Sequence, residues 1–197
     1  MGDRETLDYY DRAAADYAAR LSGATARPEL ARFIARIAPG GRVLDLGCGP
    51  GTASAAMAAA GLRPDPVDAS AGMVAHARAR HALPARQGTF DEDHGEETYD
   101  GVWASYSLLH APRAALPGLI GGLVRALRTG GTLYLGMKLG TGARRDRLGR
   151  LYTYVTEDEM RGWLGGVRVI EAVAGSSAGM TGETEPCLDL MAETPDA

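Results

Sequence analysis

Two kinds of hydrophobic spacing alternate along the chain. Apolar residues three and four positions apart predict amphipathic helices over residues 7–21, 28–37, 70–81 and 116–127. Short apolar runs bounded by turn residues predict strands over residues 42–46, 83–88, 99–104 and 132–137, with another strand ending at Asp68. Strands that alternate with helices are typical of an α/β fold with a mostly parallel sheet.

The pattern changes in the last part of the chain. Residues 138–154 are rich in glycine and arginine without a clear period, and we expect a functional loop or flap there. A capping box at Thr156 and Glu159 predicts a helix, and residues 167–174 and 186–192 predict two strands. Because no helical period separates those strands, they should pair as an antiparallel hairpin. The whole pattern predicts a three-layer αβα sandwich.

The strand over residues 42–46 leads into a glycine turn, Asp45-Leu46-Gly47-Cys48-Gly49-Pro50-Gly51. Glycine removes the Cβ atom where the backbone must turn sharply and where a ligand approaches closely. The helix that starts at Thr52 would direct its free N–H groups toward the same place, which favours an anionic or polar ligand. We therefore expect a small-molecule site at this turn.

A second acidic residue supports this site. Asp68 follows Gly47 by 21 residues and ends the second strand, where a carboxylate can accept hydrogen bonds from ribose hydroxyls. The same strand contains Pro64 and Pro66, so we expect it to be short or bulged. Dinucleotide-binding turns need glycine where Thr52 stands, which leaves an NAD(P)-dependent oxidoreductase as the weaker alternative.

Composition limits the possible partners. The 197 residues, 45% of them hydrophobic, fit a single domain, with residues 1–40 as a helical cap and residues 41–194 as the core. A net charge of −4 without a basic block argues against nucleic acid, and no apolar run is long enough for a membrane span. Two cysteines favour a reducing, cytoplasmic location. We expect a monomer or homodimer.

The glycine turn resembles the first motif of class I S-adenosylmethionine (SAM) dependent methyltransferases. Asp68-Ala69-Ser70 with Met73 resembles the second motif, and residues 99–105 and 127–133 resemble two later ones. The resemblance implies a Rossmann-like, seven-stranded sheet with an antiparallel last strand, SAM as cofactor, and methyl transfer to a small-molecule acceptor. Residues 103–110 and 138–154 resemble small bacterial enzymes related to tellurite-resistance methyltransferases. A non-catalytic SAM-binding protein is the alternative.

The resemblance also implies the site residues. The cofactor-binding residues would be Asp45, Gly47, Cys48, Gly49, Gly51, Asp68, Ala69, Met73, Thr89, Phe90, Ala104, Ser105, Tyr10 and Tyr17. Thr89 stands where the family has an acid that binds adenine. The catalytic residue is unknown, with His110 and Tyr106 as candidates, because a general base is needed only for a protonated acceptor. Candidate substrate-binding residues are His110, Lys138, Arg145 and Tyr152. No metal site is implied.

Overall fold

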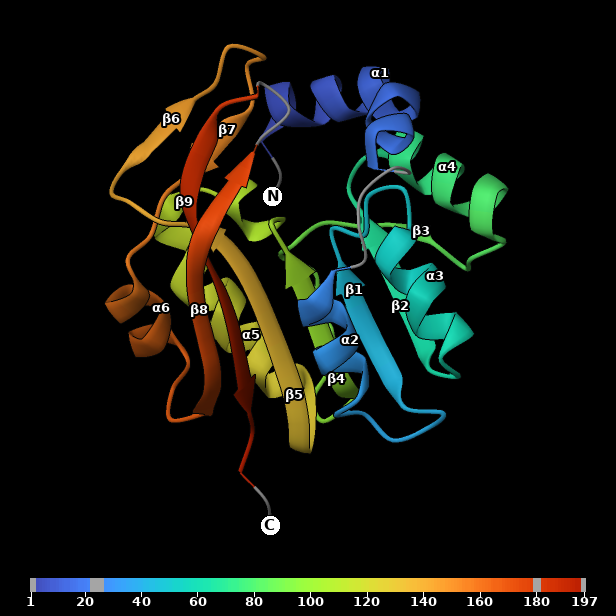
Figure 1. Cartoon of the computed structure of the whole chain (residues 1–197), viewed down its shortest axis with the longest axis vertical. Helices are drawn as coiled ribbons and strands as arrows, with labels where there is room; N and C mark the ends of the chain where they lie inside the picture. The colour runs from blue at the N-terminus through green and yellow to red at the C-terminus, as the bar shows by residue number, and fades with distance from the viewer. Residues whose placement is uncertain (1–2, 22–26, 179–181, 196–197) are drawn as a thin grey trace.

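A seven-stranded sheet forms the centre of the protein. The computed structural model describes residues 3–21, 27–178 and 182–195. In these residues the sheet strands are β1 (Arg42–Leu46), β2 (Arg63–Asp68), β3 (Arg86–Gln87), β4 (Tyr99–Ser105), β5 (Leu127–Lys138), β8 (Arg168–Ala178) and β9 (Thr184–Glu193). Their spatial order is β3-β2-β1-β4-β5-β9-β8 (Figure 1). The first five are parallel, and β9 is antiparallel to both its neighbours, which confirms the predicted Rossmann-like sheet with its antiparallel last strand.

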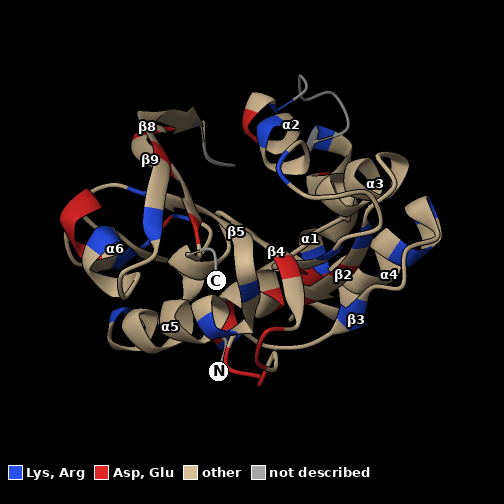
Figure 2. Ribbon diagram, turned by 90° about the horizontal axis from the view of Figure 1, so that it is seen from below, with Lys and Arg blue, Asp and Glu red and all other residues tan. Residues whose placement is uncertain are grey.

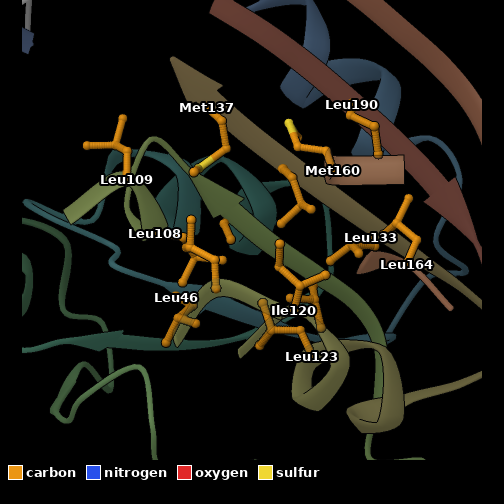
Figure 3. Packing of buried hydrophobic residues seen from close by; sticks show 14 of the residues in the cluster. Leu46, Leu108, Leu109, Ile120, Leu123, Leu133, Met137, Met160, Leu164 and Leu190 are labelled. Carbon is orange, nitrogen blue, oxygen red and sulfur yellow. The ribbon is translucent and has the colours of Figure 1, made fainter. Parts of the chain in front are cut away.

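Helices cover both faces of the sheet. They are α1 (Arg4–Leu21), α2 (Pro28–Ile34), α3 (Thr52–Ala59), α4 (Ala71–His81), α5 (Leu116–Ala126) and α6 (Glu157–Trp163). Alternate strand residues face opposite sides. On one side Leu46 and Leu133 belong to a core cluster that also includes Ile120 of α5 and Leu164 at the end of α6 (Figure 3). On the other side Trp103 and the rest of a second core cluster pack against α2 and α3. The three predicted layers are therefore present.

The second strand is longer than expected. β2 runs without a break over six residues and pairs with β1 along its whole length. Its prolines are tolerated because backbone N–H groups of a strand point alternately to its two sides. Arg63 N donates to the β1 side, so Pro64 and Pro66 face the β3 side, where pairing involves only Val67 and Asp68. The predicted shortening or bulging of this strand was wrong.

Other elements also differ from the sequence prediction, and three of them affect the site. β3 has only two residues, and β5 begins at Leu127 because the chain leaves α5 directly into an extended segment that pairs with Tyr99. The segment 138–154 contains a small hairpin, β6 (Ala143–Arg145) and β7 (Leu151–Thr153). This hairpin lies beside α1, at the top of the view in Figure 1. Together α1 and the hairpin lie over the end of the sheet at which the parallel strands terminate.

Charged residues are spread over many elements. Figure 2 shows blue and red segments on most helices, with a red stretch in the acidic loop that leads into β4. Most ion pairs, such as Arg161 with Glu157, are on the surface and each contributes at most about 1 kcal/mol. No helix in the described part of the chain is both long and apolar enough to cross a membrane.

Candidate functional site

A cavity of about 90 Å³ lies under α1, where the parallel strands end. Its wall combines the glycine turn, the end of β2, the segments after β3 and β4, and one side of α1. Twelve of the sequence-predicted residues lie on this wall: Tyr10, Tyr17, Gly47, Gly49, Asp68, Ala69, Met73, Thr89, Phe90, Ser105, Tyr106 and His110. The fold thus brings together most of the predicted site from segments far apart in the sequence.

The three glycines of the turn serve three different purposes. Gly47, Gly49 and Gly51 all have positive φ angles, of 74°, 54° and 85°. A Cβ atom on Gly47 would lie 2.3 Å from the Cβ of Ser107, so this glycine lets the turn pack against the segment after β4. A Cβ on Gly51 would lie 2.9 Å from that of Ala77, so this glycine lets α3 approach α4. Only at Gly49 would a Cβ meet nothing within 4 Å, which leaves open space on the cavity wall.

Asp68 is fixed by the backbone around it. Its Oδ2 accepts a hydrogen bond from Gly49 N at 2.8 Å, and its Oδ1 accepts one from Ser70 N at 2.9 Å. Burial raises the pKa of this carboxyl group, while the two N–H donors lower it. Each carboxylate oxygen keeps further lone pairs for a ligand. Asp68 therefore joins the glycine turn to the end of β2 and presents acceptors to the cavity.

Asp45, by contrast, lies outside the cavity wall. Its side chain is 2% exposed, and its Oδ2 accepts a hydrogen bond of 2.6 Å from Ser54 Oγ. Burial raises the pKa of Asp45 to about 7, partly offset by the Ser54 hydrogen bond. Cys48 is also buried, and Ala104 faces the core. These residues support the turn and the strands from beneath.

The raised pKa of Asp45 makes the stability of the protein depend on pH. A carboxyl group with a higher pKa in the folded state stabilises fully below its unfolded pKa of 3.8, and that contribution is lost as pH rises through about 7. The asparagine of Asp45→Asn does not titrate. We therefore expect the free energy of unfolding of this variant, measured relative to that of the wild type, to rise by about 2 kcal/mol when the pH increases from 5 to 8. Urea unfolding of both proteins at the two pH values measures this difference.

The exposed Asp16→Asn variant, which removes a surface carboxylate, is the matched control for Asp45→Asn. An Asp45→Asn difference that is the same at both pH values would show that Asp45 is not protonated on folding.

The segment after β3 lacks the expected acidic residue on the cavity wall. Thr89 and Phe90 line the cavity there. Glu92 lies nearby, but its carboxylate already accepts hydrogen bonds from Thr89 N at 3.0 Å and from Arg86 at 2.6 Å. Met73 and Phe90 leave apolar surface for a flat ring at this end of the cavity.

The segment after β4 contains a residue that the sequence analysis missed. Ser107 lies on the cavity wall, is 6% exposed, and its hydroxyl has no hydrogen-bond partner among the described residues. Its neighbours are already engaged: Ser105 Oγ accepts from Arg27 at 2.9 Å, and the Tyr106 hydroxyl donates to Asp189 at 3.0 Å. An unpartnered buried hydroxyl is costly unless a ligand bonds to it. Its position just beyond Ser105 was the only sequence signal for it.

Of the predicted substrate-binding residues, only His110 reaches the cavity wall. Tyr152 packs edge-on behind it, with ring centroids 4.9 Å apart. Lys138 is 5% exposed and forms an ion pair with Glu185, while its Nζ lies 3.9 Å from the centre of the Tyr152 ring. Arg145 forms an ion pair with Asp3 at the start of α1. The predicted cations therefore hold the surrounding structure together.

Comparison with known proteins agrees with this geometry. Residues 43–131 match a family model described as a methyltransferase domain, whereas a search of curated proteins found no match. A SAM-dependent methyltransferase from Methanosarcina mazei is 16% identical with a TM-score of 0.74, over 88% of this chain and 100% of that one. The 1,6-didemethyltoxoflavin-N1-methyltransferase of Burkholderia thailandensis, solved with its substrate and S-adenosylhomocysteine, is 21% identical with a TM-score of 0.73, over 98% and 88% of the two chains.

The matched segment runs from β1 through α5 to the start of β5, and it includes the glycine turn, Asp68 and the segment after β4. At these identities the solved structures establish the shared fold, and the family model adds the sequence match. Residues 43–131 therefore match a methyltransferase domain in sequence, and the described residues share the fold of SAM-dependent methyltransferases.

Proposed function

We propose that this protein transfers the methyl group of SAM to a small-molecule acceptor. The observation that carries the proposal is the junction of the open Gly49 turn with the half-buried Asp68 carboxylate on one cavity wall. When bound, SAM supplies an already activated methyl group, so the protein has mainly to position the acceptor, which can contribute about 7–11 kcal/mol. An obvious catalytic base is therefore not required.

The donor and acceptor groups on the wall suit this cofactor. Asp68 would accept hydrogen bonds from ribose hydroxyls, and the space beside Gly49 would admit the amino-acid end. Met73 and Phe90 would hold the adenine ring by packing, since Thr89 provides no carboxylate. The unpartnered Ser107 hydroxyl offers one further hydrogen bond. Tyr17, also on the wall, would cover the cofactor from α1.

The volume of the cavity implies that α1 moves. Ligand pockets generally occupy about 300–1,000 Å³, whereas this partly open space measures about 90 Å³. α1 is held to α4 by Asp11, whose Oδ1 accepts hydrogen bonds from Ser70 Oγ at 2.6 Å and Gly72 N at 3.1 Å. Entry of SAM would require α1 to swing outward and then close again.

A small acceptor is favoured by the small volume of the cavity and by one structural relative. The Burkholderia thailandensis enzyme binds 1,6-didemethyltoxoflavin, a small molecule, in the same fold.

Both cysteines, Cys48 and Cys187, are buried as free thiols, which supports a cytoplasmic location for this protein.

Calorimetric titration with SAM, S-adenosylhomocysteine and NADH tests the cofactor, followed by detection of S-adenosylhomocysteine release with a panel of small acceptors. Micromolar SAM binding with turnover supports the proposal. Binding without turnover on any acceptor would favour a non-catalytic SAM-binding protein. Binding of NADH alone would replace the proposal with an oxidoreductase.

A further inference from the structure

A directed chain of hydrogen bonds ends at the cavity. His110 Nδ1 lies 2.6 Å from the carbonyl oxygen of Leu151, and because a carbonyl only accepts, Nδ1 carries the hydrogen. Burial, together with the charges of Arg150 and Lys138, lowers the pKa of His110 to about 4 despite the opposing effect of the Leu151 hydrogen bond, so the ring is neutral at pH 7. Its Nε2 is then an acceptor, and it receives the hydroxyl hydrogen of Tyr10 at 2.9 Å.

This series of hydrogen bonds leaves one acceptor position on the Tyr10 hydroxyl oxygen unused. The oxygen donates its only hydrogen to His110 and accepts one from Arg150 Nη1 at 3.1 Å. A phenolic oxygen has two lone pairs, so one acceptor position remains. Tyr10 and His110 both lie on the cavity wall. A ligand at this end of the cavity can therefore satisfy Tyr10 only by donating a hydrogen.

The arginine and lysine side chains near Tyr10 and His110 already form ion pairs with carboxylates. Arg150 is 1% exposed and pairs with Asp146, while Lys138 pairs with Glu185. Arg145 pairs with Asp3 and Glu5. An anionic ligand would have to displace one of these carboxylates, which the short ion-pair distances oppose. An uncharged ligand meets no such competition.

Aromatic side chains surround the end of the cavity at which Tyr10 and His110 lie. The ring of Tyr10 contacts two other rings edge-on. Its centroid lies 5.5 Å from that of Tyr17 and 5.4 Å from that of His110. Tyr106 and Leu7 add apolar surface to the cavity wall, which also includes Asp3 and Thr6. Aromatic ligands bind well between such rings through stacked and edge-on contacts.

We propose that the methyl acceptor is an uncharged aromatic molecule with an O–H or N–H group, and that this group donates a hydrogen bond to the hydroxyl oxygen of Tyr10. His110 is a positioning residue, since it fixes the direction of the Tyr10 hydroxyl hydrogen. The inference rests on the proposed function, because the acceptor must reach the cavity that also holds SAM.

The test measures binding of three matched probes to the protein loaded with S-adenosylhomocysteine. The probes are para-cresol, its methyl ether and para-toluate, which share a ring and differ in whether they donate a hydrogen or carry a negative charge. We expect para-cresol to bind about tenfold more tightly than either of the others. Tyr10→Phe should remove this preference, while Tyr9→Phe, the neighbouring tyrosine outside the cavity wall, should retain it.

Three results would overturn the inference: tightest binding of para-toluate, equal binding of para-cresol and its ether, or an unchanged preference in Tyr10→Phe. Absence of binding by all three probes to the loaded protein would overturn it as well. Failure of S-adenosylhomocysteine itself to bind would appear before any probe is added, and would overturn the proposed function on which the inference rests.

Discussion

Asp68→Ala is expected to weaken SAM binding about 100-fold. Hydrogen bonds to a charged acceptor contribute about 1.5–3 kcal/mol each, and the loss of two accounts for at least this factor. The variant should nevertheless fold, because burial raises the pKa of the Asp68 carboxyl and its removal relieves that desolvation cost. Calorimetric titration with SAM measures the affinity, and urea unfolding measures the stability.

Two further variants separate the charge of Asp68 from its support of the turn. Asp68→Asn keeps an oxygen that can accept from Gly49 N, so its affinity should fall between those of the wild type and Asp68→Ala. Asp65→Ala removes a carboxylate of the same strand that pairs with Arg42 outside the cavity wall, and should bind SAM normally. An Asp68→Ala affinity within threefold of the wild type would show that Asp68 does not hold the ribose.

The turn was predictable from sequence because its causes are local. Glycine at positions 47, 49 and 51 demanded positive φ angles, and all three have them. The sequence could not show which glycine faces the ligand, because that depends on Ser107 and Ala77, which arrive from other parts of the chain. Asp45 illustrates the same limit: its position in the motif suggested a cofactor contact, yet its nearest donor is Ser54 in the following helix.

The hairpin of β6 and β7 was less predictable, since several of the contacts that hold it in place are with α1 and Asp3, more than a hundred positions away. Arg145 pairs with Asp3, Leu151 N donates to Thr6 Oγ1 at 2.8 Å, and Arg150 donates to Tyr10. The composition of residues 138–154 indicated a loop near the ligand but carried no period. Arg145 was predicted as a substrate contact, whereas in the structure it pairs with Asp3 at the start of α1.

Arg150→Met is expected to lower the free energy of unfolding by about 3 kcal/mol, because removing one partner of a buried ion pair leaves the other charge uncompensated. Arg150 Nη2 donates to Asp146 at 2.6 Å, and the guanidinium lies 5.0 Å from the ring centre of Tyr9 and 5.2 Å from that of Tyr152. The loss should be concentrated in α1 and the β6–β7 hairpin. Urea unfolding gives the total, and hydrogen exchange locates it.

Arg12→Met, at an exposed position of α1, controls for the loss of a surface charge and should change stability by less than about 0.5 kcal/mol. The double variant Arg150→Met with Asp146→Leu removes both charges, so it should recover part of the lost stability if the uncompensated Asp146 is the cause. Equal stability of Arg150→Met and Arg12→Met would mean that Arg150 does not hold α1 in place. In that case closure over the cavity would depend on Asp11 and its contacts with α4.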